Sequence, residues 1–131
     1  MQNTQKNIPL LKEALKKTGS VEVICTGTSM SPNIHQGELI PIRPVDTILS
    51  GDVVLFEWPP GELVVHRFLF RIPNTPWFIH LGDAAPKAHL ARYEDIIGVV
   101  DGLRKTVGAK AMVKAMEAIA RGVKNKILKR F

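Results

Sequence analysis

A serine and a histidine stand out in this 131-residue chain because their surroundings suit nucleophilic chemistry. Ser29 lies in the segment Gly27–Pro32, where a glycine and a proline favour a sharp bend of the backbone. Such a bend exposes a hydroxyl and turns neighbouring backbone N–H groups toward a substrate oxygen. A serine becomes nucleophilic only when a base lies within hydrogen-bond reach. His66, which follows the apolar run Leu63–Val65, is the candidate base.

Both residues also have an ordinary structural interpretation. Ser29 could serve only as a turn residue, together with Ser31. His66 could be a strand histidine that is hydrogen-bonded to a backbone carbonyl. The chemical interpretation gains weight from the segments that accompany these two residues.

Four short segments occur in an order that is typical of one protease superfamily. They are Gly27–Pro32, Gly51–Phe56, Val64–Arg67 and Gly82–Ala84, and Ile96–Val100 matches the last core strand. In this order they resemble the signal peptidase I superfamily of serine proteases (S24/S26 type), whose relatives include self-cleaving repressors of the bacterial DNA-damage response. The resemblance covers about residues 22–102.

The resemblance implies that Ser29 is the nucleophile and His66 the base. Many bacterial signal peptidases have a lysine as the base, and the histidine here is similar to the archaeal and endoplasmic-reticulum members. Imidazole has an ordinary pKa of about 6.5, so this assignment predicts activity that rises between pH 5 and 8.

Asp83 has two candidate roles. The resemblance implies an ion pair with Arg67, which would support the strand that carries the base. Asp83 could instead orient His66 directly, because the family's usual third group falls on residues 88–90, which contain no acid. We expect a Ser-His dyad assisted by Asp83.

The resemblance also implies a substrate pocket. Met30, Ile34, Val64 and Val65 match residues that line it, and their apolar side chains predict a shallow pocket for a small residue such as alanine. The same four residues would also suit ordinary core packing.

The composition sets limits on the class of protein. The length predicts one domain, and the single cysteine, Cys25, excludes an internal disulfide. His35, His80 and His89 match no metal-ligand spacing, so we expect surface histidines, no metal and no cofactor. No apolar run approaches the ~20 residues of a membrane span, and Met1–Lys6 lacks the apolar part of a secretory signal. These features predict a cytoplasmic protein or one that lies peripherally at the membrane surface.

The sequence divides into three parts. Residues 1–20 include a short helix at 7–18, residues 21–102 form the β catalytic domain, and residues 103–131 are a basic tail. We expect strands at 21–25, 38–43, 53–58, 62–72, 77–81 and 96–102, with a loop at 84–95. Pro41 predicts an edge position or a bulge. The fold class is therefore mainly β, similar to the signal peptidase and repressor domains, with one helix before it and one after it.

The tail carries most of the net charge of +6. From Leu103 onward nine Lys and Arg residues face one acid, Glu117, which gives +8 and leaves −2 for the rest of the chain. Residues 107–131 predict a basic amphipathic helix, loosened near Gly122, whose apolar stripe is formed by Met112, Met116, Ile119, Val123 and Ile127. This helix could contact a membrane surface or pack on the β-domain, and nucleic-acid binding is not expected because interleaved aromatic residues are absent.

Two functions remain open at this point. The first is a serine endopeptidase that cleaves a precursor or leader peptide after a small residue. The alternative is a non-catalytic regulatory or binding module of the same fold that uses its basic tail.

Overall fold

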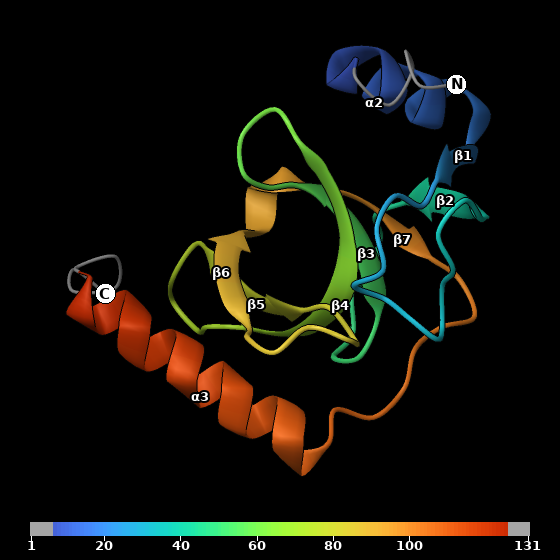
Figure 1. Ribbon diagram of the computed structural model, residues 1–131. Coiled ribbons are helices and arrows are strands. Elements are labelled where there is room, and N and C mark those ends of the chain that lie inside the picture. The colour runs from blue at the N-terminus through green and yellow to red at the C-terminus, as the bar shows by residue number, and fades with distance from the viewer. Residues whose placement is uncertain (1–6, 126–131) are drawn as a thin grey trace.

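The computed structural model describes residues 7–125, and one sheet of seven antiparallel strands forms its centre (Figure 1). The strands lie in the order β1-β2-β7-β3-β4-β5-β6. Their bounds are β1 Val21–Ile24, β2 Leu39–Pro44, β3 Val53–Glu57, β4 Leu63–Arg71, β5 Trp77–Leu81, β6 His89–Arg92 and β7 Ile96–Val100. Two α-helices, α2 (Ile8–Thr18) and α3 (Ala109–Lys124), lie near opposite ends of the sheet, and a short 3-10 helix, η1 (Tyr93–Asp95), precedes β7. The expected mainly β fold with one helix on either side in sequence is confirmed.

Helix α2 forms where its capping residues predict it. The Asn7 side chain accepts a hydrogen bond from the Leu10 N–H at 3.1 Å, and Gly19 ends the helix with a left-handed φ of 78°. Its buried stripe is Ile8, Leu11 and Leu15, which packs against β1 and β2. The helix expected over residues 7–18 is therefore confirmed.

The middle of the sheet is buried on both faces. Along β3, Val53 and Leu55 join the core cluster that contains α2, whereas Val54 and Phe56 join a second cluster with Phe68. Successive strand residues point to opposite faces, so β3 is a continuous apolar run and not an alternating one. The same alternation places His66 and Arg67 of β4 on opposite faces of the sheet.

Two expectations about the strands need correction. The predicted loop at 84–95 contains β6, which pairs His89 with His80 of β5, and η1. Four residues without a β-branched or aromatic side chain give a weak strand signal. Pro41 does not lie on an edge strand, because β2 pairs with both β1 and β7. Proline is tolerated there because the strand has a partner on one side only at this residue. Pro41 pairs with Glu22 of β1, and the pairing with β7 starts only at Ile42.

Helix α3 packs against the sheet with a different face from the one expected. Its buried residues are Ala115, Ala118 and Gly122, and it contacts β4, β5 and β6. These small side chains let the helix backbone approach the sheet closely. The helix continues through Gly122 without loosening. The predicted stripe is largely exposed, with Met112 at 38%, Met116 at 56% and Val123 at 47%, while Ile119 is partly buried; Ile127 lies outside the described residues.

No helix within residues 7–125 has both the length and the hydropathy that a membrane crossing requires.

Candidate active site

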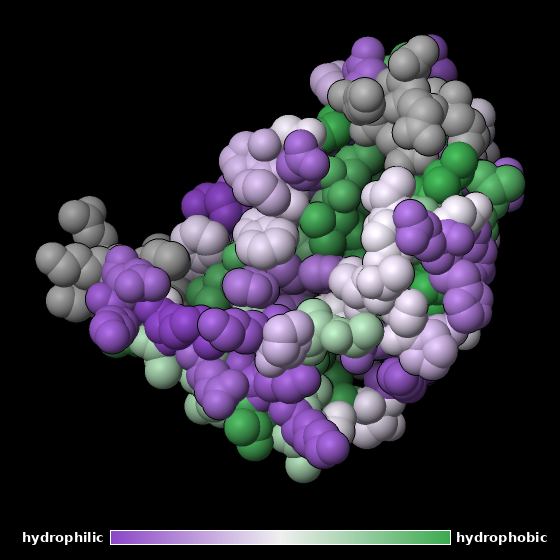
Figure 2. Space-filling view, in the orientation of Figure 1, coloured by the Kyte–Doolittle hydropathy of each residue, from purple (hydrophilic) through white to green (hydrophobic). Residues whose placement is uncertain are grey.

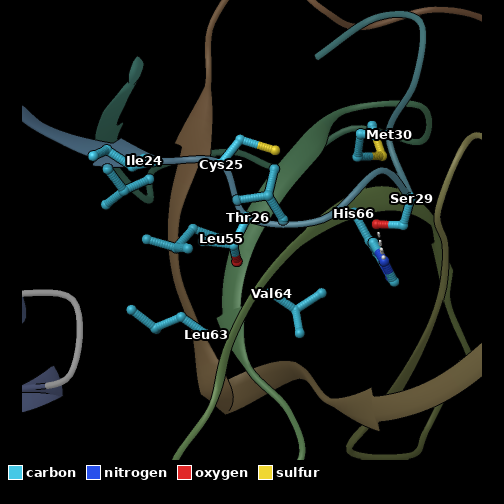
Figure 3. A pocket seen from close by; sticks show the side chains of 11 residues that line it. Ile24, Cys25, Thr26, Ser29, Met30, Leu55, Leu63, Val64 and His66 are labelled. Carbon is cyan, nitrogen blue, oxygen red and sulfur yellow. Dashed lines mark hydrogen bonds between the residues drawn. The ribbon is translucent and has the colours of Figure 1, made fainter. Parts of the chain in front are cut away.

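Ser29 and His66 meet beside the first half of β4, although 37 residues separate them in the sequence. Ser29 lies in the turn that follows β1, and His66 is the fourth residue of β4. The Ser29 Oγ lies 3.0 Å from the His66 Nε2, which is a hydrogen-bond distance (Figure 3). The hydroxyl can therefore donate to the imidazole in this arrangement.

The turn that carries Ser29 is held by the segment after β5. The Ala84 N–H donates to the Ser29 carbonyl at 2.8 Å. Gly82 has no room for a side chain, because a Cβ there would lie 2.9 Å from the Ser29 Cβ and 3.1 Å from the His66 Nε2. The glycine of this segment thus permits the close approach of Ser29 and His66.

Arg67, on the other face of β4, forms a buried ion pair with Asp83. Its Nε lies 3.1 Å from Oδ1 and one terminal nitrogen lies 2.6 Å from Oδ2, while the other terminal nitrogen donates to the carbonyls of Gly51 and Leu103. Asn33 donates to the same carboxylate at 2.6 Å. Arg67 therefore joins β4 to three separate loops.

These contacts also set the ionisation of Asp83. Burial raises its pKa, but the hydrogen bonds from Arg67 and Asn33 outweigh burial and hold the pKa below its usual value. The hydrogen bonds of the carboxylate go to these two residues, so the structure places Asp83 in the ion pair and does not place it against an imidazole nitrogen of His66.

His80 faces the Nδ1 of His66, the ring nitrogen that points away from Ser29. The two Nδ1 atoms lie 3.0 Å apart, and His80 is fully buried. The expectation of a surface histidine at this position is wrong. The available signal was the period of β5, which places His80 on the same face as Phe78. Sequence reasoning treated His80 only as a metal-ligand candidate and missed its contact with His66.

Burial determines the ionisation of this histidine cluster. It lowers the pKa of His66 from 6.5 to about 4, helped by the positive charge of His89 and opposed by the negative charge of Asp83. It lowers the pKa of His80 to about 2, again helped by its histidine neighbours. Both rings are therefore neutral near pH 7, the state in which imidazole can accept a proton. Within residues 7–125, no three His, Cys, Asp or Glu side chains are arranged to hold a metal ion.

A cavity of about 120 Å³ lies beside Ser29, between the end of β1 and the start of β4 (Figure 3). Met30, Val64 and Val65 line it, together with residues of β1 and the turn after it. Figure 2 shows a hollow of hydrophobic surface in this region. Ile34, also expected in the pocket, is not among the lining residues; it is buried in the core cluster that contains α2.

The lining also includes Cys25, the second nucleophilic side chain near the site. Burial raises the pKa of its thiol, and the charge of Glu38 raises it further. A thiol in this state holds its proton, so Cys25 is poorly suited to nucleophilic attack.

The fold and the site thus combine an antiparallel β-sheet with a hydrogen-bonded serine and histidine beside an apolar cavity. Residues 1–101 match the peptidase S24-like family, and the chain belongs to this family. The match includes all seven strands and ends before α3. No curated protein matches the chain.

Proposed function

We propose that this protein is a serine endopeptidase that cleaves a precursor or leader peptide after a small residue. The observation that carries the proposal is the 3.0 Å contact between the Ser29 Oγ and the His66 Nε2 at the edge of an apolar cavity. The peptidase S24-like family supports the same class of reaction.

In the proposed reaction the Ser29 Oγ attacks the scissile carbonyl carbon while its proton moves to the His66 Nε2. The backbone N–H of Ser29 would stabilise the negative charge that develops on the carbonyl oxygen. His66 then returns the proton to the leaving amine, the C–N bond breaks, and water hydrolyses the acyl-enzyme by the same route.

The sheet offers a binding edge for an extended substrate. β5 pairs with β4 only from Arg67 onward, so Leu63–Val65 have a strand partner on one side alone among the described residues. An extended peptide could pair with this edge, as peptides often do with open sheet edges. Its side chain at the cleavage site would then lie near the cavity, whose size suits alanine or a similarly small group.

The test uses a library of internally quenched peptides with alanine at the scissile position. The wild-type protein should cleave members of this library, and Ser29→Ala should reduce kcat/KM by at least ~10³-fold. Thr28→Ala removes a neighbouring, exposed hydroxyl and is the matched control, which should retain activity. Equal cleavage by the wild type and Ser29→Ala, or no cleavage of any member by the wild type, would overturn the proposal.

A second candidate function is binding to an anionic lipid surface through α3. Its solvent-exposed side carries large apolar residues, and the neighbouring side carries four cations and Glu117. Two of the cations, Lys114 and Arg121, donate to backbone carbonyls of the β-domain, which leaves Lys110 and Lys124 exposed. The exposed apolar residues are Met112, Val113, Met116 and Val123. In the view of Figure 2, hydrophilic side chains cover much of α3. An apolar stripe beside a basic one is complementary to lipid tails and anionic headgroups.

Vesicle sedimentation tests this second role. The protein should pellet with phosphatidylglycerol vesicles more than with phosphatidylcholine vesicles, and Met112→Gln/Met116→Gln should remove most of this binding. Leu10→Gln/Leu49→Gln changes two apolar residues of similar exposure elsewhere and is the control. Equal loss in both double variants, or a dimer that only the α3 variant dissociates, would overturn lipid binding.

A further inference from the structure

A second histidine lies directly behind the candidate base. His80 is buried in β5, and its Nδ1 lies 3.0 Å from the Nδ1 of His66. At this distance one nitrogen must carry a proton and the other must offer its lone pair, because two lone pairs or two protons would repel each other. The position of this single proton determines whether His66 can act as a base.

Only one of the two arrangements is productive. If the His66 Nδ1 carries the proton, the neutral ring leaves its Nε2 free to accept from the Ser29 hydroxyl, 3.0 Å away. If the His80 Nδ1 carries it, the neutral His66 ring must hold its own proton on Nε2, which then faces the Ser29 oxygen. His66 could not receive a proton at Nε2 in that second arrangement.

The surroundings of His80 favour the productive arrangement. There, His80 accepts at Nδ1 and carries its proton on Nε2, an atom that is buried without a hydrogen-bond partner among the described residues. The rings of Phe56 and Trp58 lie 4.7 and 4.6 Å from the His80 ring, centroid to centroid. An aromatic ring is a weak acceptor for such an N–H, and no donor among the described residues is hydrogen-bonded to this atom, as a bare nitrogen would require.

We propose that His80 is a positioning residue that accepts a hydrogen bond from the His66 Nδ1–H and so fixes the tautomer of the base. Ser29, His66 and His80 then form a row of three hydrogen-bonded side chains. This inference rests on the proposed peptidase activity and extends it, because Asp83 is engaged with Arg67 and Asn33 and His80 occupies the orienting position.

The proton balance of this row is simple. During attack the O–H bond of Ser29 breaks, the bond from Oγ to the carbonyl carbon forms, and His66 becomes a cation with protons on both nitrogens. Its Nδ1–H stays hydrogen-bonded to the neutral His80, which gains no proton. The anion that favours this cation is Asp83, whose charge raises the pKa of His66.

Two substitutions at His80 separate positioning from packing. His80→Phe keeps a ring but removes the acceptor, and we expect kcat to fall about 10²-fold with KM within about threefold, since His66 then samples the wrong tautomer. His80→Asn places its Oδ1 near the position of Nδ1, and we expect it to restore most of kcat. His89→Phe changes the neighbouring ring, which faces His80 and not Ser29, and is the matched control that should stay within about threefold of the wild type. Equal kcat in the wild type and both His80 variants, or no recovery with Asn, would overturn the proposal.

A measurement that needs no substrate keeps the two proposals distinguishable. The ¹⁵N NMR shifts of the His66 ring in the wild type should show a protonated Nδ1 and a bare Nε2, and His80→Phe should shift the ring toward a mixture of tautomers. A merely structural role for His80 would change the melting temperature but not the tautomer ratio. A His66 ring protonated on Nε2 in the wild type would overturn the role of His80, whether or not any peptide is cleaved.

Discussion

Two polar clusters begin at consecutive residues of β4 and differ in how well the fold satisfies them. Arg67 reaches one side, where all its hydrogen bonds go to Asp83 and to backbone carbonyls. His66 reaches the other, where it joins Ser29 and His80 in a neutral row that leaves one buried nitrogen without a hydrogen-bond partner among the described residues. The charged cluster therefore has the features of a structural ion pair that joins loops. The neutral cluster keeps an imidazole and a hydroxyl in contact without a charged partner, as a reactive site would.

The largest expected effect comes from breaking the charged cluster. Arg67→Met leaves the Asp83 carboxylate buried without its main partner, and we expect the free energy of unfolding to fall by about 3–5 kcal/mol. Urea denaturation measures this change. Arg43→Met, which removes exposed ion pairs, is the control and should cost about 1 kcal/mol or less. If Arg67→Met lowers the free energy of unfolding as little as the control does, the charged cluster does not stabilise the fold.

The next effect concerns the geometry of the neutral row. In Gly82→Ala the new Cβ would press on the Ser29 carbonyl oxygen and Cβ and on the His66 Nε2, so the turn that carries Ser29 must shift relative to His66. We expect kcat/KM on the quenched peptides to fall about 10²-fold, the size typical of a displacement of about 1 Å. Gly108→Ala adds a Cβ with nothing within 4 Å and should retain activity. Full activity in Gly82→Ala would contradict the described approach.

The two clusters should also lose their contribution to stability over different pH ranges. The folded-state pKa values of His66 and His80 lie below the unfolded value of 6.5, so the unfolded chain binds more protons as the pH falls below 6.5. From pH 7 to pH 5 each histidine should therefore lower the free energy of unfolding by about 2 kcal/mol. The pKa of Asp83 is lowered from 3.8 in the folded chain. Its contribution to stability is therefore complete above pH 3.8 and is lost as the pH falls below that value. Chemical denaturation at several pH values checks this order, and His80→Phe should flatten the upper part of the curve.

The smallest expected effect is a nearly flat activity profile near neutrality. The sequence predicts activity that rises between pH 5 and 8, but burial moves the pKa of His66 to about 4. We therefore expect kcat/KM at pH 5.5 to be within about twofold of its value at pH 7.5, where an ordinary histidine would give about a tenfold difference. A midpoint between pH 6 and 7 would show that water reaches the ring more freely than in this structure.

The sequence predicts those parts of the molecule whose signal is local. The capped helix α2 and most of the strands follow from such signals. The contact between Ser29 and His66 is not local, and it was expected only because the ordered segments resemble a protease superfamily. The face of α3 was predicted incorrectly, because periodicity reveals an apolar stripe but not that Ala115, Ala118 and Gly122 fit the sheet more closely than methionines. His80 was missed because its role depends on the register between β4 and β5, which no local pattern determines.

The partly unpaired edge of β4 has a consequence for what can be digested. Only an extended segment can pair with this edge, so a segment folded into a helix would first have to unwind. Under the proposed activity, such a folded segment would therefore resist cleavage even where its sequence fits the site. The protein's own Ala118-Ile119-Ala120 offers small residues of the kind proposed for the cleavage site, but it lies within α3, with Ala118 only 1% exposed. Under the proposed activity, keeping that helix wound and docked would protect the chain from cleaving itself.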